Sequence, residues 1–351
     1  MRPTNALTFD IEDWHELAQR RLYGTRVAPR AETTANTRRI LSLLRRHQVR
    51  ATFFIVGSTA AALPDLVREI AADGHEIGNH GYDHRRIPEL SQAEFAADLA
   101  ACSATLHELT DEPITGFRAP HLSLGSSQSW VYGELEAAGI GYDSSVLASG
   151  THAPHAAAGS SITELPIATL RVGSRRVPVG GGFLRFLPPG VIRHALRGIN
   201  AAGEPATVFL HPHDFAPEAL RIAAQSDEAR ERARLALWTV RRNFRRGGPV
   251  ERLLDSLIDE FAFAPAGEVI EAGGAAGPTG RGSATPSTRA PAPSTPSTSR
   301  ARPSRACSTR PSPSGSRARS SAAATCVGSR FSTQGAVRVA TPSSSHDAEL
   351  T

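Results

Sequence analysis

The stretch ALTFDIEDW, residues 6–14, is an apolar run that ends abruptly in acidic residues. Short apolar runs are typical of strands buried on both faces of a parallel sheet. Asp10, Glu12 and Asp13 come together at the end of this strand, where carboxylates repel one another unless a cation or a shared proton relieves the repulsion. The stretch therefore indicates a buried strand that leads into a charged site. A turn aspartate followed by an acidic helix N-terminus would give the same letters.

Patterns typical of strands and helices alternate from Ala6 to Phe263, which predicts an α/β domain with a parallel sheet. Ser91 and Glu94 have the spacing of a capping box, and Gly74 stands where a left-handed helix end is expected. The predicted strands are residues 6–11, 50–57, 75–80, 115–120, 139–146 and 206–212. The predicted helices are residues 33–48, 63–74, 91–109, 227–248 and 249–261.

Polar residues recur where these strands end. In a parallel sheet or barrel the carboxyl ends of the strands meet at one rim, where catalytic groups collect. The residues that such a rim would bring together are Asp10, Glu12, Asp13, His80, His84, Arg118, Asp143 and His211.

His80 and His84 are the candidate metal ligands of this set. A spacing of four residues lets two imidazoles reach one ion in a helix, or in a tight loop that follows a strand. The pair alone is a common accident, but the acidic end of the first strand offers the carboxylate that a third ligand requires. His75 opens the strand before them and is expected to face solvent.

Three further motifs offer groups for acid–base chemistry. Arg118, in GFRAPH, carries a permanent charge that could hold a carboxylate or form an ordinary surface ion pair. Asp143 lies in GYDSSV, and FLHPHDF contains His211, His213 and Asp214. A histidine whose tautomer is set by a carboxylate can be a general acid, although a lone histidine is more often a buried structural group.

In this order the motifs resemble those of the NodB-type polysaccharide deacetylases, carbohydrate esterase family 4, over about residues 6–215. TFDIEDW, GYDSS, GGGFLRFLP and LHP look like the branch associated with bacterial exopolysaccharide loci of the exosortase kind. The resemblance implies a distorted (β/α) barrel. It also implies a metal-dependent hydrolase that removes N-acetyl, or O-acetyl, groups from amino sugars of a bacterial polysaccharide or its lipid-linked precursor.

The resemblance also implies a role for each matching residue. Asp10 would be the general base, held by Arg118, and His211 would be the general acid, tuned by Asp143. The backbone N–H of His121 would contribute to the oxyanion hole.

His80 and His84 would bind the metal together with one carboxylate. The adjacent aspartate pair of the family is replaced here by D-I-E-D, so the third ligand is Asp13 or Glu12, with Asp13 preferred. Zn²⁺ is the expected ion, and Co²⁺, Ni²⁺ or Mn²⁺ are alternatives. Gly81 is a further departure, since Ser or Thr is usual at that position, and the proline of the GFRAPH motif comes one residue early.

Two other functions are compatible with this pattern. Relatives of the fold include allantoinase-like enzymes, which hydrolyse a small cyclic amide but tend to lose the acidic ligand or the histidine pair. A non-catalytic relative that only binds polysaccharide is the other alternative. The joint presence of Asp10, His80, His84, Arg118 and His211 favours a working deacetylase over both.

The composition divides the chain at about residue 266. Residues 267–351 are mostly Ala, Ser, Pro, Thr, Gly and Arg, a composition that predicts a disordered tail or, since it would also arise from a misread GC-rich frame, a frameshift product. The tail has ten Arg and four acidic residues, so residues 1–266 carry about −1 of the total charge of +5. The positive net charge of the chain therefore comes from the tail and does not indicate a nucleic-acid-binding surface on the predicted domain, residues 1–266.

Three cysteines, Cys102, Cys307 and Cys326, give no disulfide framework and no cysteine-based zinc site. The N-terminus enters a strand directly, and no run approaches the length of a membrane helix. The expected location is the cytoplasm, with peripheral membrane contact possible, and the expected partner is an N-acetylated polysaccharide or oligosaccharide.

Overall fold

The first predicted strand is β1 (Asn5–Ile11) in the computed structural model, which describes residues 3–224 and 228–275. All seven of its residues are buried, and all of its neighbours are parallel to it. It pairs on one side with β10 (Thr207–Leu210) and on the other with β2 (Thr52–Ile55) and, ahead of β2, with β11 (Phe263–Ala264). The α/β class with a parallel sheet is therefore confirmed.

The sheet continues from β2 in the strand order β10-β1-β2-β3-β4-β5-β7-β6. Only the last pair, β6 with β7, is antiparallel. Each predicted strand lies in this sheet. The remaining bounds are β3 (Glu76–Asn79), β4 (Gly116–Phe117), β5 (Tyr142–Asp143), β6 (His155–Ala156) and β7 (Thr163–Glu164).

The regular strands form a curled half-barrel, and irregular backbone closes the remaining side. After β7 the chain forms a bridge between Ile167 and Leu147, and the Ala168 N–H then donates to the Thr207 carbonyl of β10 at 3.0 Å. The antiparallel pair β8 (Thr169–Val172) and β9 (Arg175–Pro178) follows, and Gly180 then bridges to Phe209. The expected distorted barrel is confirmed in this form.

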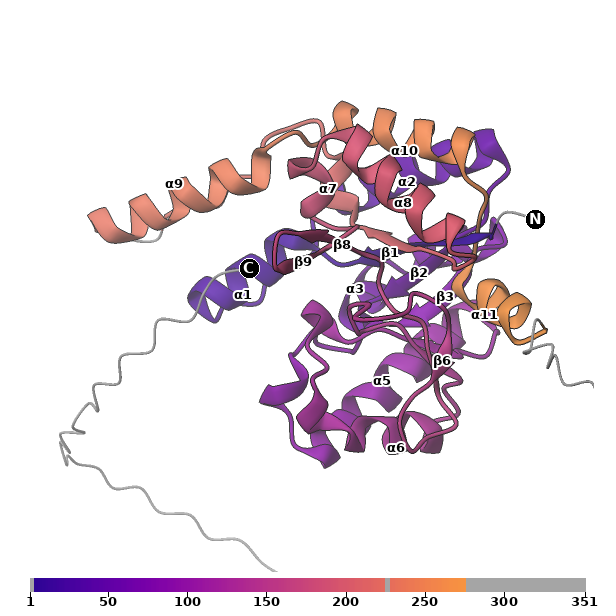
Figure 1. Ribbon diagram of the computed structural model, residues 1–351. Helices are drawn as coiled ribbons and strands as arrows, with labels where there is room; N and C mark the ends of the chain where they lie inside the picture. Colours follow the sequence, from indigo (N-terminus) through magenta and orange to yellow (C-terminus); the bar gives the residue numbers. More distant parts are fainter. Residues whose placement is uncertain (1–2, 225–227, 276–351) are drawn as a thin grey trace, which may run out of the picture. The chain divides into compact units, whose positions relative to one another are not determined.

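Helices cover the strands on both sides, with α2, α8 and α10 above them and α5 and α6 below them in Figure 1. Ser91 and Glu94 form the predicted capping box of α5, and Gly74 has a φ of 77° after α4. The helices are α1 (Trp14–Tyr23), α2 (Ala31–His47), α3 (Gly57–Ala62), α4 (Pro64–Ala72), α5 (Gln92–Thr110), α6 (Trp130–Ala137), α7 (Phe183–Phe186), α8 (Pro189–Ala201), α9 (Ala229–Asn243), α10 (Gly248–Glu260) and α11 (Ala266–Ala275). Short 3₁₀ turns occur at Ile87–Glu89, Pro120–Leu122, Ser126–Gln128 and Pro212–Phe215.

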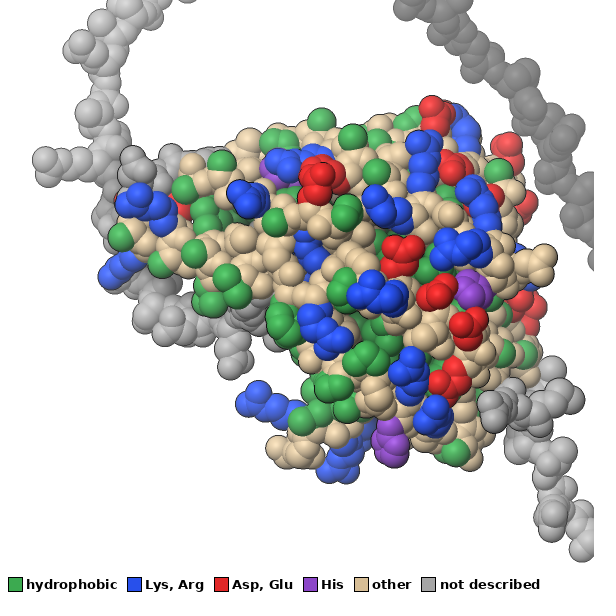
Figure 2. Space-filling model, turned by 90° about the horizontal axis from the view of Figure 1, so that it is seen from above, with side chains coloured by type: hydrophobic (Ala, Val, Ile, Leu, Met, Phe, Trp, Pro, Cys, Tyr) green, Lys and Arg blue, Asp and Glu red, His purple; other side chains and the backbone are tan. Residues whose placement is uncertain are grey.

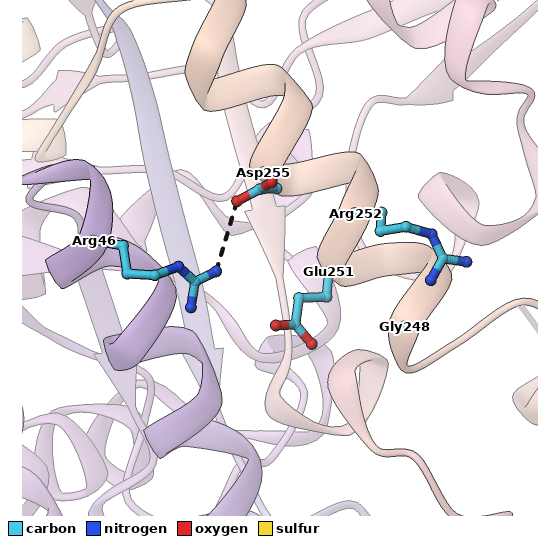
Figure 3. A pocket seen from close by; sticks show the side chains of 5 residues that line it. All are labelled: Arg46, Gly248, Glu251, Arg252 and Asp255. Carbon is cyan, nitrogen blue, oxygen red and sulfur yellow. Dashed lines mark ion pairs between the residues drawn. The ribbon is translucent and has the colours of Figure 1, made fainter.

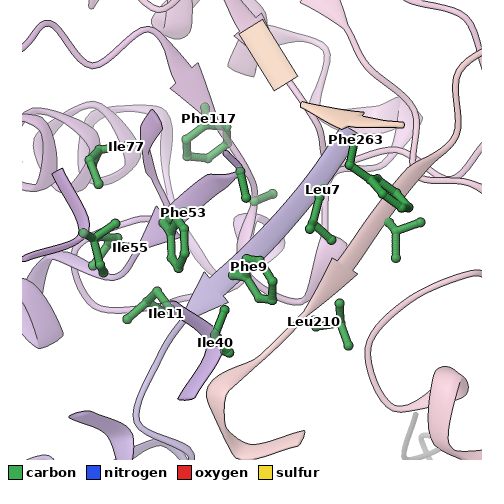
Figure 4. Close-up of a cluster of buried hydrophobic side chains, with 14 of the residues drawn as sticks. Leu7, Phe9, Ile11, Ile40, Phe53, Ile55, Ile77, Phe117, Leu210 and Phe263 are labelled. Carbon is green, nitrogen blue, oxygen red and sulfur yellow. The ribbon is translucent and has the colours of Figure 1, made fainter. Parts of the chain in front are cut away.

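The two faces of β1 separate the core from the interior of the barrel, because successive side chains of a strand point to opposite sides. Leu7, Phe9 and Ile11 point outward into the main hydrophobic cluster, where Ile40 of α2 covers them (Figure 4). Ala6 points inward and packs with Phe54, Tyr142 and Leu165. Asp10 shares this inward face, so the barrel delivers its carboxylate to the rim.

The boundary of the tail differs from the prediction. The predicted disordered tail starts at residue 267, but the first residues of that segment belong to the helix α11. Val269 of this helix is buried in the cluster that contains Ala6 and Phe54. A sequence so rich in Ala and Gly gave no signal for this packing. Residues 276–351 lie outside the described residues. In the part of the chain that the structure describes, no helix is both long and apolar enough to cross a membrane.

Candidate active site

The ends of β1, β3, β4, β5 and β10 meet at one rim, as predicted. The register aligns Phe9 with Leu210, Asp10 with Phe54, and Asn79 with Phe117. The residues at and just after these strand ends therefore come close together: Asp10 near the end of β1 and Glu12 after it, His80 and His84 after β3, Arg118 after β4 and His211 after β10.

Glu12, His80 and His84 place one ligand atom each within 4.8 Å of one another. The Glu12 Oε2 and His84 Nε2 atoms form an ion pair at 2.8 Å, and among the described residues this buried nitrogen has no other partner. His80 Nδ1 lies 2.8 Å from the Arg118 carbonyl, to which only an N–H can donate, so its Nε2 keeps a free lone pair. Two imidazoles and one carboxylate are a donor set that fits a divalent transition metal such as Zn²⁺.

Asp13 is not part of this group, contrary to the sequence-based preference. Its side chain begins α1 by accepting from the Glu16 N–H at 2.7 Å, and it also accepts from the Arg30 N–H at 2.8 Å and the Thr33 hydroxyl at 2.7 Å. Three hydrogen bonds occupy the carboxylate and turn it away from the histidines. Of the two alternatives, Glu12 is the one that reaches His84.

The two histidines are brought together by a tight loop, which was one of the two expected geometries. Gly81 has a φ of 72° and His84 a φ of 52°, both in the left-handed region. The Gly81 N–H donates to Asn79 Oδ1 at 2.8 Å, and a Cβ on Gly81 would lie 3.3 Å from Pro120. A serine or threonine would be strained there, which explains the departure from the usual motif. His75, expected to face solvent, is instead buried against Phe53.

Arg118 is fully buried and holds Asp10, as predicted. Its Nη1 donates to Asp10 Oδ1 at 2.8 Å and to the Thr8 hydroxyl at 2.7 Å. Its Nε and Nη2 donate to the carbonyl and the hydroxyl of Ser144, both at 2.8 Å. The guanidinium also lies over the Phe54 ring, 4.2 Å from the centroid. The surface ion pair that the sequence left open is thereby excluded.

Asp143 does not contact His211, contrary to the implied tuning role. The Ser145 hydroxyl donates to Asp143 and accepts from the Ala119 N–H at 2.7 Å, so Asp143 braces the loop after β4. Glu164 of β7 is its other neighbour. Burial raises the pKa of Asp143 and of Glu164, and the charge of Asp143 raises the pKa of Glu164 further. The two carboxyl groups therefore favour holding a proton between them.

The partner of His211 is Asp214, three residues further along the same motif. Asp214 Oδ2 accepts from the His211 N–H at 3.0 Å and lies 3.3 Å from His211 Nδ1. Its other oxygen lies 3.1 Å from Nε of Arg185, and both side chains of this ion pair are buried. His211 Nε2 faces Asp10 Oδ2 at 3.8 Å. Arg185 was not among the predicted site residues, and its only sequence signal was its place in the motif GGGFLRFLP.

The glycines of that motif allow close approach to the site. A Cβ on Gly180 would lie 2.1 Å from the Phe209 ring, and one on Gly181 would lie 2.7 Å from it and 3.4 Å from His211 Cε1. Gly181 also has a φ of 48°. Only glycine lets this backbone cover Phe209 and approach His211.

The charges of Asp10 and His211 suit a base and an acid. Burial alone would raise the pKa of Asp10, but the charge and hydrogen bond of Arg118, with His80 and His211, hold that pKa below its ordinary value. Burial alone would lower the pKa of His211, but Asp214, Glu12 and Asp10 together raise it above its ordinary value. The surroundings thus favour the charged form of Asp10 and the protonated form of His211.

His121 lies at the same rim, in the turn after β4. Its φ of 57° is left-handed, and its ring contacts that of His84, with the centroids 4.6 Å apart. His121 is exposed, and partial desolvation by the surrounding atoms lowers the pKa of its ring. The role of its backbone N–H stays a prediction.

A separate hollow of about 270 Å³ lies between α2 and α10 and contains none of these residues (Figure 3). Its lining includes Arg46 and Asp255, which form an ion pair at 3.6 Å, with both side chains about half exposed. Such pairs are weak and common on surfaces. We therefore assign the candidate active site to the barrel rim.

Comparison with known proteins divides the described chain into two consecutive regions. Residues 2–139 match the family model described as Polysaccharide deacetylase. Residues 140–271 match the family model described as Domain of unknown function (DUF3473). The boundary falls between β4 and β5, so it runs through the sheet and divides the site residues between the two regions.

Curated relatives match about a quarter of the chain. The chain is 34% identical over 85 residues to a peptidoglycan-N-acetylglucosamine deacetylase of Bacillus cereus, which is 24% of this chain and 31% of the relative. It is 39% identical over 80 residues to a chitooligosaccharide deacetylase of Bradyrhizobium sp., which is 23% of this chain and 30% of that relative. The chain thus spans about a third of the length of these relatives.

Solved structures share the fold over most of the chain. A structure from Mycobacterium smegmatis, provisionally named a polysaccharide deacetylase, has a TM-score of 0.53 at 20% identity and covers 82% of this chain and 95% of that one. The structure of Puue allantoinase also has a TM-score of 0.53, at 17% identity, and covers 80% and 92%. At these identities the likeness concerns the fold alone. Residues 2–139 therefore match the polysaccharide deacetylase family, the NodB type or carbohydrate esterase family 4, and residues 140–271 match the DUF3473 region that follows it.

Proposed function

We propose that this protein is a metal-dependent deacetylase that hydrolyses the N-acetyl groups of amino sugars in a bacterial polysaccharide or its precursor. The observation that carries the proposal is the position of Asp10 and His211, which face each other across 3.8 Å beside the Glu12, His80 and His84 group. The names of the curated relatives support the reaction class, since two of them are deacetylases of N-acetylglucosamine or chitooligosaccharide.

Glu12, His80 and His84 would hold the metal. The set of two nitrogens and one oxygen, the buried His84 Nε2 and the free Nε2 of His80 support a Zn²⁺ ion, with Co²⁺, Ni²⁺ or Mn²⁺ as alternatives. A divalent cation in such a site supplies Lewis-acid chemistry, by which it lowers the pKa of water and polarises a carbonyl group.

Asp10 would act as the general base. Its carboxylate takes a proton from water as the water oxygen attacks the acetyl carbonyl carbon. Arg118 occupies Oδ1 at 2.8 Å, which leaves Oδ2 to accept that proton. Because Arg118 also makes hydrogen bonds to Thr8 and Ser144, it keeps the orientation of Asp10 fixed during the transfer.

His211 would act as the general acid. When the tetrahedral intermediate collapses, the C–N bond breaks and His211 Nε2 gives its proton to the departing amine, so that acetate and the free amino sugar leave. The raised pKa of His211 keeps that proton available at neutral pH. We propose that the backbone N–H of His121 donates to the oxyanion, a contribution that is typically about 3 kcal/mol for one donor.

We further propose that the substrate is the lipid-linked precursor of an exopolysaccharide, deacetylated at the cytoplasmic face of the membrane. The support is the resemblance of TFDIEDW, GYDSS, GGGFLRFLP and LHP to the exosortase-associated branch. Activity on lipid-linked oligosaccharide in membrane extracts is the expected result. Activity found only in a secreted fraction would contradict this location.

Metal content and acetate release together test the function. The purified full chain should contain a stoichiometric divalent metal and release acetate from N-acetylated chito-oligosaccharides, and His80→Ala should lose both. His194→Ala is the matched control, because His194 is exposed on α8, and it should lose neither. Acetate release that survives His80→Ala would refute the metal-dependent mechanism. Hydrolysis of a ureide without acetate release would favour the allantoinase-like alternative, and saccharide binding without hydrolysis would favour a non-catalytic relative.

A further inference from the structure

We infer that Asp214 and Arg185 are positioning residues for His211, an inference that rests on the proposed function. Asp214 Oδ2 lies 3.3 Å from His211 Nδ1 and accepts from the His211 N–H at 3.0 Å. The two contacts fix both the ring and the backbone of His211 against one carboxylate. The motif resemblance assigned no role to either residue, since it implied that Asp143 tunes His211.

The carboxylate selects which ring nitrogen gives up its proton. A negative oxygen beside Nδ1 favours the tautomer in which Nδ1 carries the proton, so the proton that leaves is the one on Nε2. Nε2 is the nitrogen that faces Asp10 Oδ2 at 3.8 Å. Without Asp214, the imidazole could turn or keep its proton on either nitrogen.

Arg185 keeps Asp214 ionised in a buried place. The side chains of both residues are almost entirely inaccessible, and an isolated buried carboxylate would protonate instead of remaining charged. Interactions with His213, His211 and Arg185 outweigh burial and hold the pKa of Asp214 well below its ordinary value, and of these three groups Arg185 is the one with a permanent charge. Arg185 is itself fixed, because its Nη1 donates to the Arg242 carbonyl at the end of α9.

The glycine run explains how Arg185 enters the site. A Cβ on Gly182 would lie 3.0 Å from Arg185 Nη2, so a larger residue there would press on the guanidinium. Gly181 covers Phe209, and the helix α7 that follows turns Arg185 inward. His211, Asp214 and Arg185 all lie within residues 140–271. The DUF3473 region therefore supplies the acid half of the site, and the deacetylase domain supplies the base and the metal ligands.

A double-mutant cycle tests the inference in the full chain. Asp214→Asn should lower kcat by roughly 100-fold, the upper end for loss of an orienting partner, and should leave KM and metal content nearly unchanged. In a His211→Ala background the same change should cost nothing further, because Asp214 acts through His211. Losses that multiply in the double variant, or a change confined to KM, would overturn the inference. Asp65→Asn, at an exposed position on α4, is the control.

Two additional measurements cover loss of folding and failure of the proposed function. If Asp214→Asn unfolds, Arg185→Met combined with Asp214→Asn removes both charges; it should fold but keep the low kcat. Nitrogen-15 NMR of the His211 ring, recorded at a pH above its pKa where the ring is neutral, reports the tautomer without any substrate. Nδ1 should carry the proton in the wild type but not exclusively in Asp214→Asn. An unchanged tautomer would overturn the positioning role. A changed tautomer in a protein that releases no acetate would uphold that role and refute the proposed function alone.

A different observation carries a second proposal: we propose that α9 docks on an anionic membrane surface. Leu237, Val240 and Phe244 lie three and four residues apart, on one stripe of the helix and its end, and are 62%, 68% and 43% exposed. Phe244 stacks on Phe186, with ring centroids 5.0 Å apart, and Phe186 is also 48% exposed. An exposed, continuous apolar stripe of this kind usually marks an interaction surface.

The stripe is not the face by which α9 packs on the protein. Leu235 is buried on the opposite side in a cluster with Trp14 and Leu220, and Glu231 accepts from the Tyr23 hydroxyl at 2.5 Å. One face of α9 is thus anchored on α1 and on residues 216–222. The other face remains available to a partner.

Charge identifies that partner as an anionic surface. Residues 228–246 contain seven Arg and two Glu, a net charge of +5. A second copy of this helix, or the basic tail of this chain, would be repelled. Figure 2 shows basic and hydrophobic side chains interspersed at the left, where α9 lies. An apolar stripe flanked by arginines is typical of helices that lie in the membrane interface, where the cations are attracted to an anionic surface.

Vesicle sedimentation tests the membrane proposal. The full chain should sediment with vesicles of phosphatidylcholine and phosphatidylglycerol and much less with phosphatidylcholine alone. Leu237→Glu combined with Val240→Glu should abolish binding although the basic tail is retained. Val191→Glu, at an exposed apolar position on α8, should not. Binding that survives the α9 double variant would refute the proposal, as would a dimer by light scattering that this variant makes monomeric, or α9-dependent binding of a nucleic acid but not of vesicles.

Discussion

Arg118 donates to Asp10 at 2.8 Å, and both side chains are buried. Removing one partner of such a pair leaves a buried charge uncompensated, which typically costs about 3 to 5 kcal/mol. We therefore expect Arg118→Met to lower the free energy of unfolding by that amount, measured by urea denaturation. Combining it with Asp10→Asn should recover part of the loss but no activity. A fully additive loss in the double variant would show that the two residues do not interact.

Glu12 and Asp13 are adjacent but should respond to substitution in opposite ways. Glu12→Gln should lose the bound metal with little change in stability, because Glu12 reaches His84, and the metal content of the purified protein measures this. Asp13→Ala should keep the metal but lose about 2 kcal/mol of stability, since it removes the cap of α1 and leaves three donors without their acceptor. The reverse pattern would restore Asp13 as the ligand.

The pH dependence of the reaction should reflect Asp10 and His211. Asp10 acts deprotonated, and its lowered pKa places the loss of activity on acidification below its ordinary value of 3.8. His211 acts protonated, and its raised pKa places the alkaline loss above 6.5. The profile of kcat/KM should therefore be broad, and Asp214→Asn should move its alkaline limb to lower pH. An alkaline limb that does not move would show that a group other than His211 titrates there.

Glu164 should make the protein less stable as the pH rises. Because its pKa is well above 4.5 in the folded state, the folded protein binds this proton more tightly than the unfolded chain does. That stabilisation is complete below the unfolded pKa and is lost as the pH rises through the folded pKa, at about 1.4 kcal/mol per unit of difference. Glu164→Gln should remove this slope in urea denaturation at pH values above the ordinary 4.5 of a glutamate. An equal slope in the variant would assign the effect to other groups.

The motifs were sufficient to predict the strands, the rim and most of the residues at it, because each depends on local sequence and on the geometry of parallel strands. Asp10, His80, His84, Arg118 and His211 meet as expected. The capping box at Ser91 and the left-handed Gly74 also follow from local chemistry alone.

The assignments that differ depend on which neighbour a side chain finds. Asp13 is the better match to the family motif, but the start of α1 and Thr33 compete for its oxygens. Asp143 interacts with Ser145 and Glu164, whereas the carboxylate that contacts His211 is that of Asp214. Arg185 joins the site only through the bridge between Gly180 and Phe209, a contact that no sequence period encodes.

During translation, β1 is synthesised long before two of the strands with which it pairs. Ala6 pairs with Thr207 and Ala264, which are synthesised 201 and 258 residues later. At the usual speed of translation, one edge of this apolar strand waits roughly 10 to 40 s for its partner. During that time it can pair with other chains or with a chaperone, so the yield of native protein should depend on how fast residues 140–271 follow the deacetylase domain out of the ribosome.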